Sequence, residues 1–318
     1  MERQNLLDFD YESNGEEVMF PSHQTAPHEK PFNESCLYDN SHELFDQQER
    51  QQVGNADGQV CLPDFELDKT KENHVSFGAN ISVVQANELI RSKQDELTLL
   101  EAKLIKFAVA QIVEWEPDRR TFKVPVMQLV NYLGMDKANV YRDLDSLTTS
   151  VMKKMVYIKS KEPDKFGKYG YKKFQWITWA SYQNGIIEMT INEALSPYLN
   201  GLQQLFTRYL YSDIIKLPTY HSIRLYELLS SYWNMKFSRY PINRTFDDIE
   251  IEKDEVYFRI DQLKNFLNLE NKYANNGDFI IHVIEPSVKA IRKHTMMRPV
   301  VRKVKKGRSI IGLVFKYE

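Results

Sequence analysis

An internal repeat constrains the fold of this chain of 318 residues more than any other feature. The stretches QLVNYLGM (Gln128–Met135) and QLKNFLNL (Gln262–Leu269) share Gln, Leu, Asn and Leu at the same positions, and Tyr132 matches Phe266. A chain of this length can hold two domains of ordinary size, each with its own core. The repeat therefore predicts two copies of one structural unit.

The elements expected around the two copies follow the same order. Amphipathic helices are expected at residues 98–113 and 222–233, and the short extended segments TFKV and VYFRI follow them. After each copy we expect another helix, over residues 140–155 and 278–294, and then two strands. The strands are VYIKSK and YKKFQWITWASY in the first unit, and RPVVRKVKKGRSIIGLVFKYE supplies both in the second. Helix, short strand, helix, helix and hairpin is the layout of a winged helix, so we predict an α+β fold with two tandem winged-helix domains.

Charge divides the chain into two parts. Residues 1–73 hold 17 Asp or Glu and 5 Lys or Arg (17 − 5, net −12), whereas residues 74–318 hold 37 basic and 27 acidic residues (37 − 27, net +10). The first part also lacks sustained hydrophobic periodicity, which is typical of disorder. We therefore expect a disordered acidic extension (1–73), an N-terminal winged-helix domain (74–216) and a C-terminal one (217–318). A basic folded part favours nucleic acid as partner, although surface charge can also serve solubility alone.

The expected helix 140–155 has one apolar and one polar side. Its apolar stripe consists of Val140, Leu144, Leu147, Val151 and Met155. The polar side carries the candidate DNA-binding residues Asn139, Arg142, Ser146, Thr149 and Lys153. Arg and Asn can contact guanine and adenine edges in bidentate fashion, and Ser or Thr can reach bases or phosphates. The alternative is the solvated polar face that most surface helices have.

In the second unit, Pro286 should bend or restart the helix because proline lacks a backbone donor. Val288, Ile291 and Thr295 then form the inner side. The outer side carries the candidates Lys289, Lys293 and the flanking Arg292, for which phosphate contact is more strongly indicated than base reading.

A dense basic run follows that helix. Residues 292–315 contain eight Lys or Arg and no acidic residue. KKGR reads as a hairpin turn with Gly307, so the candidate wing residues are Arg302, Lys303, Lys305, Lys306 and Arg308. A disordered basic tail is the alternative, but the apolar stretch SIIGLVFKY favours an ordered wing. The run Lys153–Lys173, with eight Lys, is expected to form the corresponding first wing.

The stretch YKKFQWITWASY mixes aromatic residues with lysines. This composition allows base stacking on single-stranded nucleic acid. Aromatic residues in strands more often fill a core, so a core role is favoured over stacking.

The chain lacks the motifs of several enzyme classes. It contains no Gly-x-x-x-x-Gly-Lys-Ser/Thr phosphate loop and no closely spaced histidine pair. Its two cysteines, Cys36 and Cys61, match no zinc-finger spacing with His42 and imply no disulfide framework. We expect no enzyme activity, no cofactor and no metal. No apolar stretch reaches the length of a membrane span and the start has no signal-peptide pattern, so a cytoplasmic protein without membrane contact is expected.

Four blocks resemble one protein family in order and spacing. ISVVQANELIRSKQDELTLLEAKLIKFAVAQI (81–112), LPTYHSIRLYELLSSYW (217–233), FRIDQLKNFLNL (258–269) and VIEPSVKAIRK (283–293) are similar to initiator replication proteins of iteron-bearing, theta-replicating plasmids. The resemblance covers about residues 78–318. The acidic segment 1–73 lies outside it.

The resemblance implies a function and partners. It implies two winged-helix domains that bind origin repeats, help to open the duplex and recruit the host replication initiator and helicase without cutting DNA. It also implies dimers that repress the protein's own promoter and monomers that bind the repeats. The main sequence-specific contact is then expected at residues Lys289–Arg308. Family members often carry basic residues after the position of Phe279, whereas this chain has Ile280, Ile281 and His282, so His282 is the candidate to replace one of them.

Two other functions remain open. A transcriptional repressor could use the same double winged helix, and gene-adjacent direct repeats of about two helical turns would favour initiation over repression alone. A nicking enzyme would cleave a supercoiled origin with a divalent metal.

Overall fold

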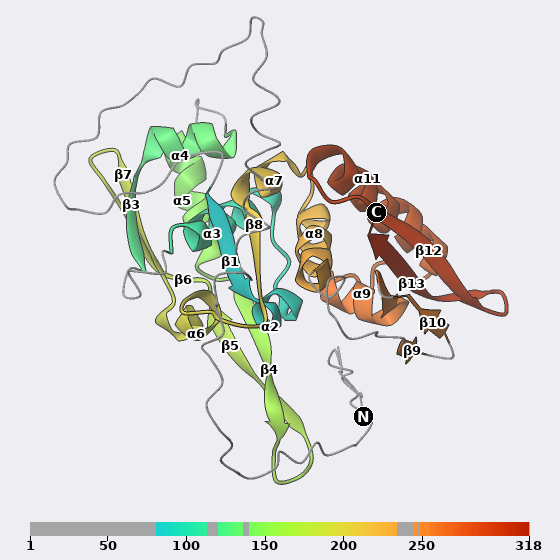
Figure 1. The fold of residues 1–318 in the computed structure, drawn as a ribbon. Coiled ribbons are helices and arrows are strands. Elements are labelled where there is room, and N and C mark those ends of the chain that lie inside the picture. Colours follow the sequence, from blue (N-terminus) through green and yellow to red (C-terminus); the bar gives the residue numbers. More distant parts are fainter. Residues whose placement is uncertain are drawn as a thin grey trace, which may run out of the picture. The chain divides into compact units, whose positions relative to one another are not determined.

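Two three-stranded sheets with the same strand order show the duplication (Figure 1). The computed structural model describes residues 81–112, 120–135, 140–233, 244–246, 249–252 and 254–317. One sheet has the order β3-β7-β6 and the other β11-β13-β12. In both, the strand between the first two helices pairs with the last strand of a hairpin, as in a winged helix. The α+β fold with two winged-helix domains is therefore confirmed, while the expected extension 1–73 lies outside the described residues.

The first domain begins with a strand that pairs with a distant one. β1 (Ser82–Ala86) runs antiparallel to β8 (Phe206–Leu210). The other elements of this half are α2 (Asn87–Arg91), β2 (Lys93–Gln94), α3 (Leu99–Ala110), β3 (Thr121–Pro125), α4 (Val126–Leu133), α5 (Val140–Val151), β4 (Met155–Pro163), β5 (Tyr169–Gln175), β6 (Ile177–Gln183), β7 (Ile186–Ile191), α6 (Ser196–Leu199) and α7 (Tyr211–Lys216).

In the described part of the second half, the elements begin at α8 (Tyr220–Trp233). They continue with β9 (Arg244–Phe246), β10 (Ile249–Ile251), β11 (Glu255–Arg259), α9 (Ile260–Phe266), α10 (Asn276–Phe279), α11 (Glu285–His294), β12 (Pro299–Lys306) and β13 (Ser309–Tyr317). No described helix is long and apolar enough to cross a membrane.

The repeated octapeptides form equivalent helices with equivalent ends. The first copy lies in α4 and its following turn, and the second lies in α9 and its turn. Gly134 and Asn268 occupy the same position of the two copies, and their φ angles are 69° and 58°. Glycine and asparagine are the residues that enter this left-handed region most readily, so both copies end their helix by the same backbone reversal.

Helix α3 starts where local chemistry predicts. The Thr98 side chain accepts a hydrogen bond from the Glu101 backbone N–H (3.2 Å), and the Glu101 carboxylate accepts one from the Thr98 N–H (2.6 Å). This reciprocal pair satisfies two backbone donors that a helix start leaves free. The buried side of α3 includes Leu104, Phe107 and Ala108.

Helix α5 is shorter than the expected helix 140–155. Val140, Leu144, Leu147 and Val151 form the predicted buried stripe. Met155, however, belongs to β4, where its N–H donates to the Asp95 carboxylate (2.8 Å) and its carbonyl accepts from the Asp95 N–H (2.9 Å). With these contacts Met155 lies in a strand and not in a helix, so the expectation of a helix to residue 155 was wrong.

The expected strand YKKFQWITWASY is in fact two strands in two sheets. It breaks at Trp176, whose side chain is buried. Upstream, β5 pairs with β4 in the sheet β2-β4-β5, and downstream, β6 pairs with β7. The hairpin that corresponds by sheet order to β12–β13 is therefore β6–β7. The assignment of the first wing to Lys153–Lys173 was wrong, because that run builds an additional hairpin, β4–β5.

Helix α8 packs against elements of both halves (Figure 1). On one side, the Glu227 carboxylate lies 2.7 Å from Lys106 Nζ of α3 and accepts a hydrogen bond from Gln85 Nε2 of β1 (3.1 Å). On the other side the Tyr317 hydroxyl of β13 donates to the carbonyl of Leu229 (2.8 Å). The expected domain boundary between residues 216 and 217 stays a prediction, since α8 belongs by its contacts to both cores.

The predicted restart at Pro286 coincides with a change of helix type. A π-helical segment covers Ile280–Ile284, and α11 begins at Glu285 with proline in its first turn. Pro286 has no backbone N–H to donate to the preceding helical turn, so the regular bonding pattern is interrupted there. Val288, Ile291 and Thr295 are buried as expected.

Candidate nucleic-acid interface

The tip of the β12–β13 hairpin carries exposed cations. Lys306 pairs in register with Ser309, and Gly307 turns the chain with a φ of 62°. Lys305, Lys306 and Arg308 are exposed, and none of them forms an ion pair with another described residue. The ordered wing predicted from the sequence is therefore present, with three exposed cations at its end.

The base of the same wing is different. Arg302 Nη2 lies 3.2 Å from Glu255 of β11, and Lys303 Nζ lies 2.9 Å from Glu285 of α11. These two cations already have carboxylate partners within the domain. An anion that approached them would compete with those carboxylates, so the tip is the stronger anion site.

A close approach fixes the wing on its sheet. A Cβ at Gly312 of β13 would lie 2.2 Å from the ring of Tyr257 on β11. A larger residue there would displace the Tyr257 ring, so glycine allows the ring to lie directly on the hairpin.

The turn before the recognition helix is anchored to the wing. Lys264 Nζ of α9 donates to the Tyr273 carbonyl and to Asn276 Oδ1, both at 2.7 Å. Asn276 Nδ2 in turn donates to the Ile310 carbonyl of β13 (2.9 Å). Burial lowers the pKa of Lys264, whose ammonium group serves this internal network. The start of the recognition helix and the wing are thus held together.

The outer side of the second recognition helix is basic and exposed. His282, Lys289 and Lys293 are all exposed, one or two helical turns apart. Arg292 is half-buried and its Nη1 donates to the Pro299 carbonyl (3.2 Å), which ties α11 to β12. Among the DNA-binding candidates predicted on this helix, Arg292 therefore already forms a hydrogen bond within its own domain.

The outer side of α5 matches the expected polar face. Arg142, Ser146 and Thr149 are exposed along the helix, and Lys153 is exposed just beyond its end. Arg142 Nη2 lies 3.1 Å from the neighbouring Asp143, and three quarters of its side chain is exposed. A pair so exposed holds the guanidinium only weakly, which leaves it able to exchange partners. Asn139 lies outside the described residues.

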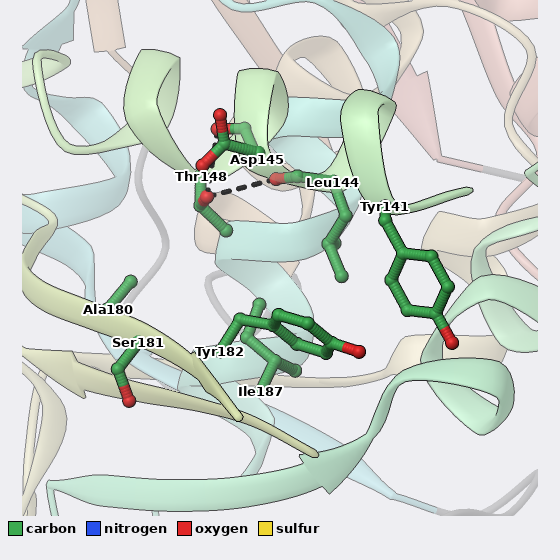
Figure 2. Close-up of a pocket in the computed structure, with 8 residues that line it drawn as sticks. All are labelled: Tyr141, Leu144, Asp145, Thr148, Ala180, Ser181, Tyr182 and Ile187. Atoms are coloured by element: carbon green, nitrogen blue, oxygen red, sulfur yellow. Dashed lines mark hydrogen bonds between the residues drawn. The ribbon is translucent and has the colours of Figure 1, made fainter. Parts of the chain in front are cut away.

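A small hollow separates α5 from the β6–β7 hairpin (Figure 2). Figure 2 shows Leu144 of α5 facing Tyr182 and Ile187 of the hairpin across this space. The rings of Tyr141 and Tyr182 lie 5.2 Å apart between their centroids. The recognition helix and the first wing of this domain therefore adjoin, as α11 and β12–β13 do.

Sequence reasoning missed this first wing although a signal was present. The two strands are joined by Asn184 and Gly185, whose φ angles are 53° and 77°. Asn-Gly between alternating strands is a strong short-range indication of a hairpin. The first wing was instead assigned to the preceding segment because of its many lysines, but charge density does not determine strand pairing.

No metal-binding group of His, Cys, Asp or Glu occurs among the residues that the structure describes. Cys36, His42 and Cys61 lie outside them.

Two family models match the chain over the same two halves. The model described as "Initiator Replication protein, WH1" matches residues 82–230, and "Initiator Rep protein, WH2" matches residues 259–317. Together they cover more than half of the chain. The first match includes most of α8.

Individual relatives agree with these models. A replication initiation protein of Escherichia coli is 27% identical over 245 residues, which are 76% of this chain and 70% of that protein. A crystal structure of the Pi initiator protein in complex with iteron DNA superposes with a TM-score of 0.57 at 18% identity, covering 76% of this chain and 98% of that one. The latter likeness concerns the fold. With both winged-helix models matched in order, the chain belongs to the initiator replication protein family.

Proposed function

We propose that this protein is a plasmid replication initiator that binds double-stranded origin repeats, or iterons, in a sequence-specific manner. Its family membership supports this function, and the Pi initiator, which shares the fold, is bound to iteron DNA in its crystal structure. The observation that carries the proposal is the duplicated pairing of a polar recognition helix with an adjoining hairpin. Two such units in one chain suit one bipartite site.

The residues divide into two roles. Lys305, Lys306 and Arg308 at the wing tip neutralise phosphates, because they are exposed and form no ion pair with another described residue. Lys289 and Lys293 do the same from α11, with His282 in the π-helical segment that precedes it.

On α5, Arg142 reads a base edge, and Ser146, Thr149 and Lys153 position the helix on the backbone. Asn139 is retained as a base-reading candidate from the sequence. Arg302, Lys303 and Arg292 contribute indirectly, since each holds a part of the wing or helix in place.

Further steps belong to the same proposal. Binding at the repeats promotes opening of the origin, and the protein recruits the host replication initiator and helicase. Dimers repress the promoter of its own gene while monomers bind the repeats. The protein does not cut DNA, and it works in the cytoplasm.

A replication assay tests initiation directly. The gene and its flanking DNA are placed on a circle with a selectable marker and no other origin, and maintenance in the host is scored. Initiation requires that the circle is maintained with the intact gene and lost with Arg142→Ala or the Lys305→Ala/Lys306→Ala pair. A circle that is never maintained, although the protein represses a reporter joined to the same flanking DNA, would establish a repressor.

The purified protein with Mg²⁺ should leave the supercoiled circle closed. Relaxation of the circle would instead establish a nicking enzyme.

A further inference from the structure

The β4–β5 hairpin is an addition to the winged-helix plan. Its strand β4 pairs with β2, and neither strand joins the sheet that holds the first wing; no described element of the second domain corresponds to this hairpin. Figure 1 shows the hairpin continuing well beyond its short pairing with β2. Neither recognition helix nor either wing includes it, so duplex recognition as proposed above leaves its surface unassigned.

One face of this hairpin alternates aromatic and basic side chains. Tyr157 lies opposite Lys173, and Lys159 lies opposite Tyr171 in the register of the two strands. Tyr169 lies two residues before Tyr171 and so shares its face, because side chains alternate along a strand. We call these five residues the hairpin platform.

The aromatic rings of the platform are open to solvent toward the hairpin end. Tyr169 and Tyr171 are 49% and 42% exposed, and Phe166 in the turn is 73% exposed. Trp176, which follows β5, is by contrast buried. Within the stretch YKKFQWITWASY, the favoured expectation of a core role therefore holds for Trp176 but not for Tyr171.

Cations lie beside these rings. Lys159 Nζ is 4.3 Å from the centroid of the Tyr169 ring, and Lys173 Nζ is 5.3 Å from that of Tyr171 and 5.6 Å from that of Tyr157. The Tyr157 ring is held in place, since its hydroxyl donates a hydrogen bond to the Asp95 carboxylate (2.8 Å). Burial and that hydrogen bond raise its pKa to about 12. The platform is thus an ordered surface that presents flat rings and positive charges together.

We propose that the hairpin platform binds single-stranded DNA. Every base has a flat face that can stack on an aromatic ring, and lysines beside the rings attract the phosphates that connect the bases. In a duplex each base face is covered by the neighbouring base pair. A row of open rings therefore suits unpaired strands. This activity is separate from recognition of duplex repeats and lies on different elements.

The test compares ligands that differ only in their bases. The full chain is titrated with a labelled oligothymidine of about 20 nucleotides and with an abasic strand of the same length. Stacking requires that the oligothymidine binds at least about tenfold more tightly. Equal affinity would show attraction to phosphates alone and overturn the proposal, as would the absence of binding. Binding to oligouridine more than about tenfold tighter than to oligothymidine would overturn the assignment to DNA.

Variants locate the site. Tyr169→Ala/Tyr171→Ala removes two rings and should weaken oligothymidine binding by about 30-fold or more, while Tyr169→Phe/Tyr171→Phe keeps the rings and should bind as the parent does. Trp179→Ala removes a ring of similar exposure from β6 and should have no effect on this binding. Loss in the Phe pair, or equal loss in Trp179→Ala, would place the site elsewhere.

The two faces of the hairpin supply a matched pair of lysines. Lys173 lies on the platform, whereas the adjacent Lys172 lies on the other face. Lys173→Ala should weaken binding of oligothymidine more than Lys172→Ala. Equal effects would contradict a one-sided platform. Binding of the duplex repeat should be the same in the Tyr169→Ala/Tyr171→Ala pair as in the parent, and its loss there would overturn the separate role of the platform. A parent that binds oligothymidine but not the duplex repeat would contradict the proposed function and leave the platform standing.

Discussion

At the scale of single residues, the basic block at the C-terminal end is not uniform. Lys305, Lys306 and Arg308 at the wing tip form no ion pair within the described part of the chain, whereas Arg302 and Lys303 have carboxylate partners. The sequence showed only that all five are positive. The difference between these two groups of cations depends on Glu255 and Glu285, which are distant from the wing in sequence. Sheet pairing brings Glu255 to the wing, and helix packing brings Glu285 to it.

The wing tip should act through charge alone. Lys305→Ala/Lys306→Ala removes about two phosphate neutralisations, so the slope of log K against log salt should fall in magnitude by about 1.8. Affinity should fall alike for the repeat and for random duplex, because phosphates carry no sequence. Lys316→Ala is the control, as Lys316 lies 2.6 Å from Glu252 and away from the tip. An unchanged slope in the double variant would mean that the tip does not contact DNA.

Arg142 should contribute to the sequence specificity of DNA binding. Arg142→Ala should cost ~1–3 kcal/mol of binding free energy on the proper repeat and much less on random duplex, if the guanidinium contacts a guanine edge. Arg142→Lys keeps the charge but not the bidentate geometry, so it should lose affinity for the repeat only. Competition binding with both DNAs separates these effects. Equal losses on both would reduce Arg142 to a phosphate contact.

At the scale of elements, α8 depends on a buried charge cluster. Lys106, Arg224 and Glu227 are all almost completely buried, and the distances to Glu227 are 2.7 and 3.3 Å. Burial by itself opposes ionisation of Glu227, but Lys106 and Arg224 hold the pKa of its carboxyl below the usual value. The Arg224 guanidinium also lies 4.1 Å from the ring centroid of Phe266 in α9. One cluster therefore joins the cores of both halves.

Removal of the central carboxylate should be costly. Glu227→Gln leaves two buried cations without their counter-charge, and the free energy of unfolding should fall by about 3–5 kcal/mol. Glu193→Gln is the matched control, since that carboxylate is exposed and lies 3.5 Å from Arg120, and it should cost less than about 1 kcal/mol. Urea unfolding followed by circular dichroism measures both. A small loss for Glu227→Gln would show that the cluster does not hold α8.

Much of the fold could be predicted from the chain, and the errors have physical causes. Helical periodicity located α3, α5 and α8, and the Gly307 turn located the second wing, because these features depend on neighbours in sequence. The first wing was misplaced because four strands follow α5, and their pairing depends on contacts between distant strands. The hydrogen bond of Arg292 within its domain and the packing of α8 against both halves also depend on tertiary contacts.

At the scale of the whole molecule, the acidic and basic parts should be separable. The shift in composition near residue 73 predicts that residues 74–318 fold and bind DNA without the first 73 residues. Limited proteolysis should leave a stable core that starts near His74. A fragment of residues 74–318 should unfold cooperatively and bind the repeat. Failure of that fragment to fold would show that the acidic part belongs to the core.

We propose that two winged-helix domains of one chain read one repeat together. Hydroxyl-radical footprinting of the full chain on the DNA that flanks its gene can detect both domains at once. Two domains on one side of the duplex should protect two patches in each repeat, about 10 base pairs apart, and Arg142→Ala should weaken one patch more than the other. A single patch in each repeat, or equal weakening of both patches by Arg142→Ala, would contradict recognition by two domains.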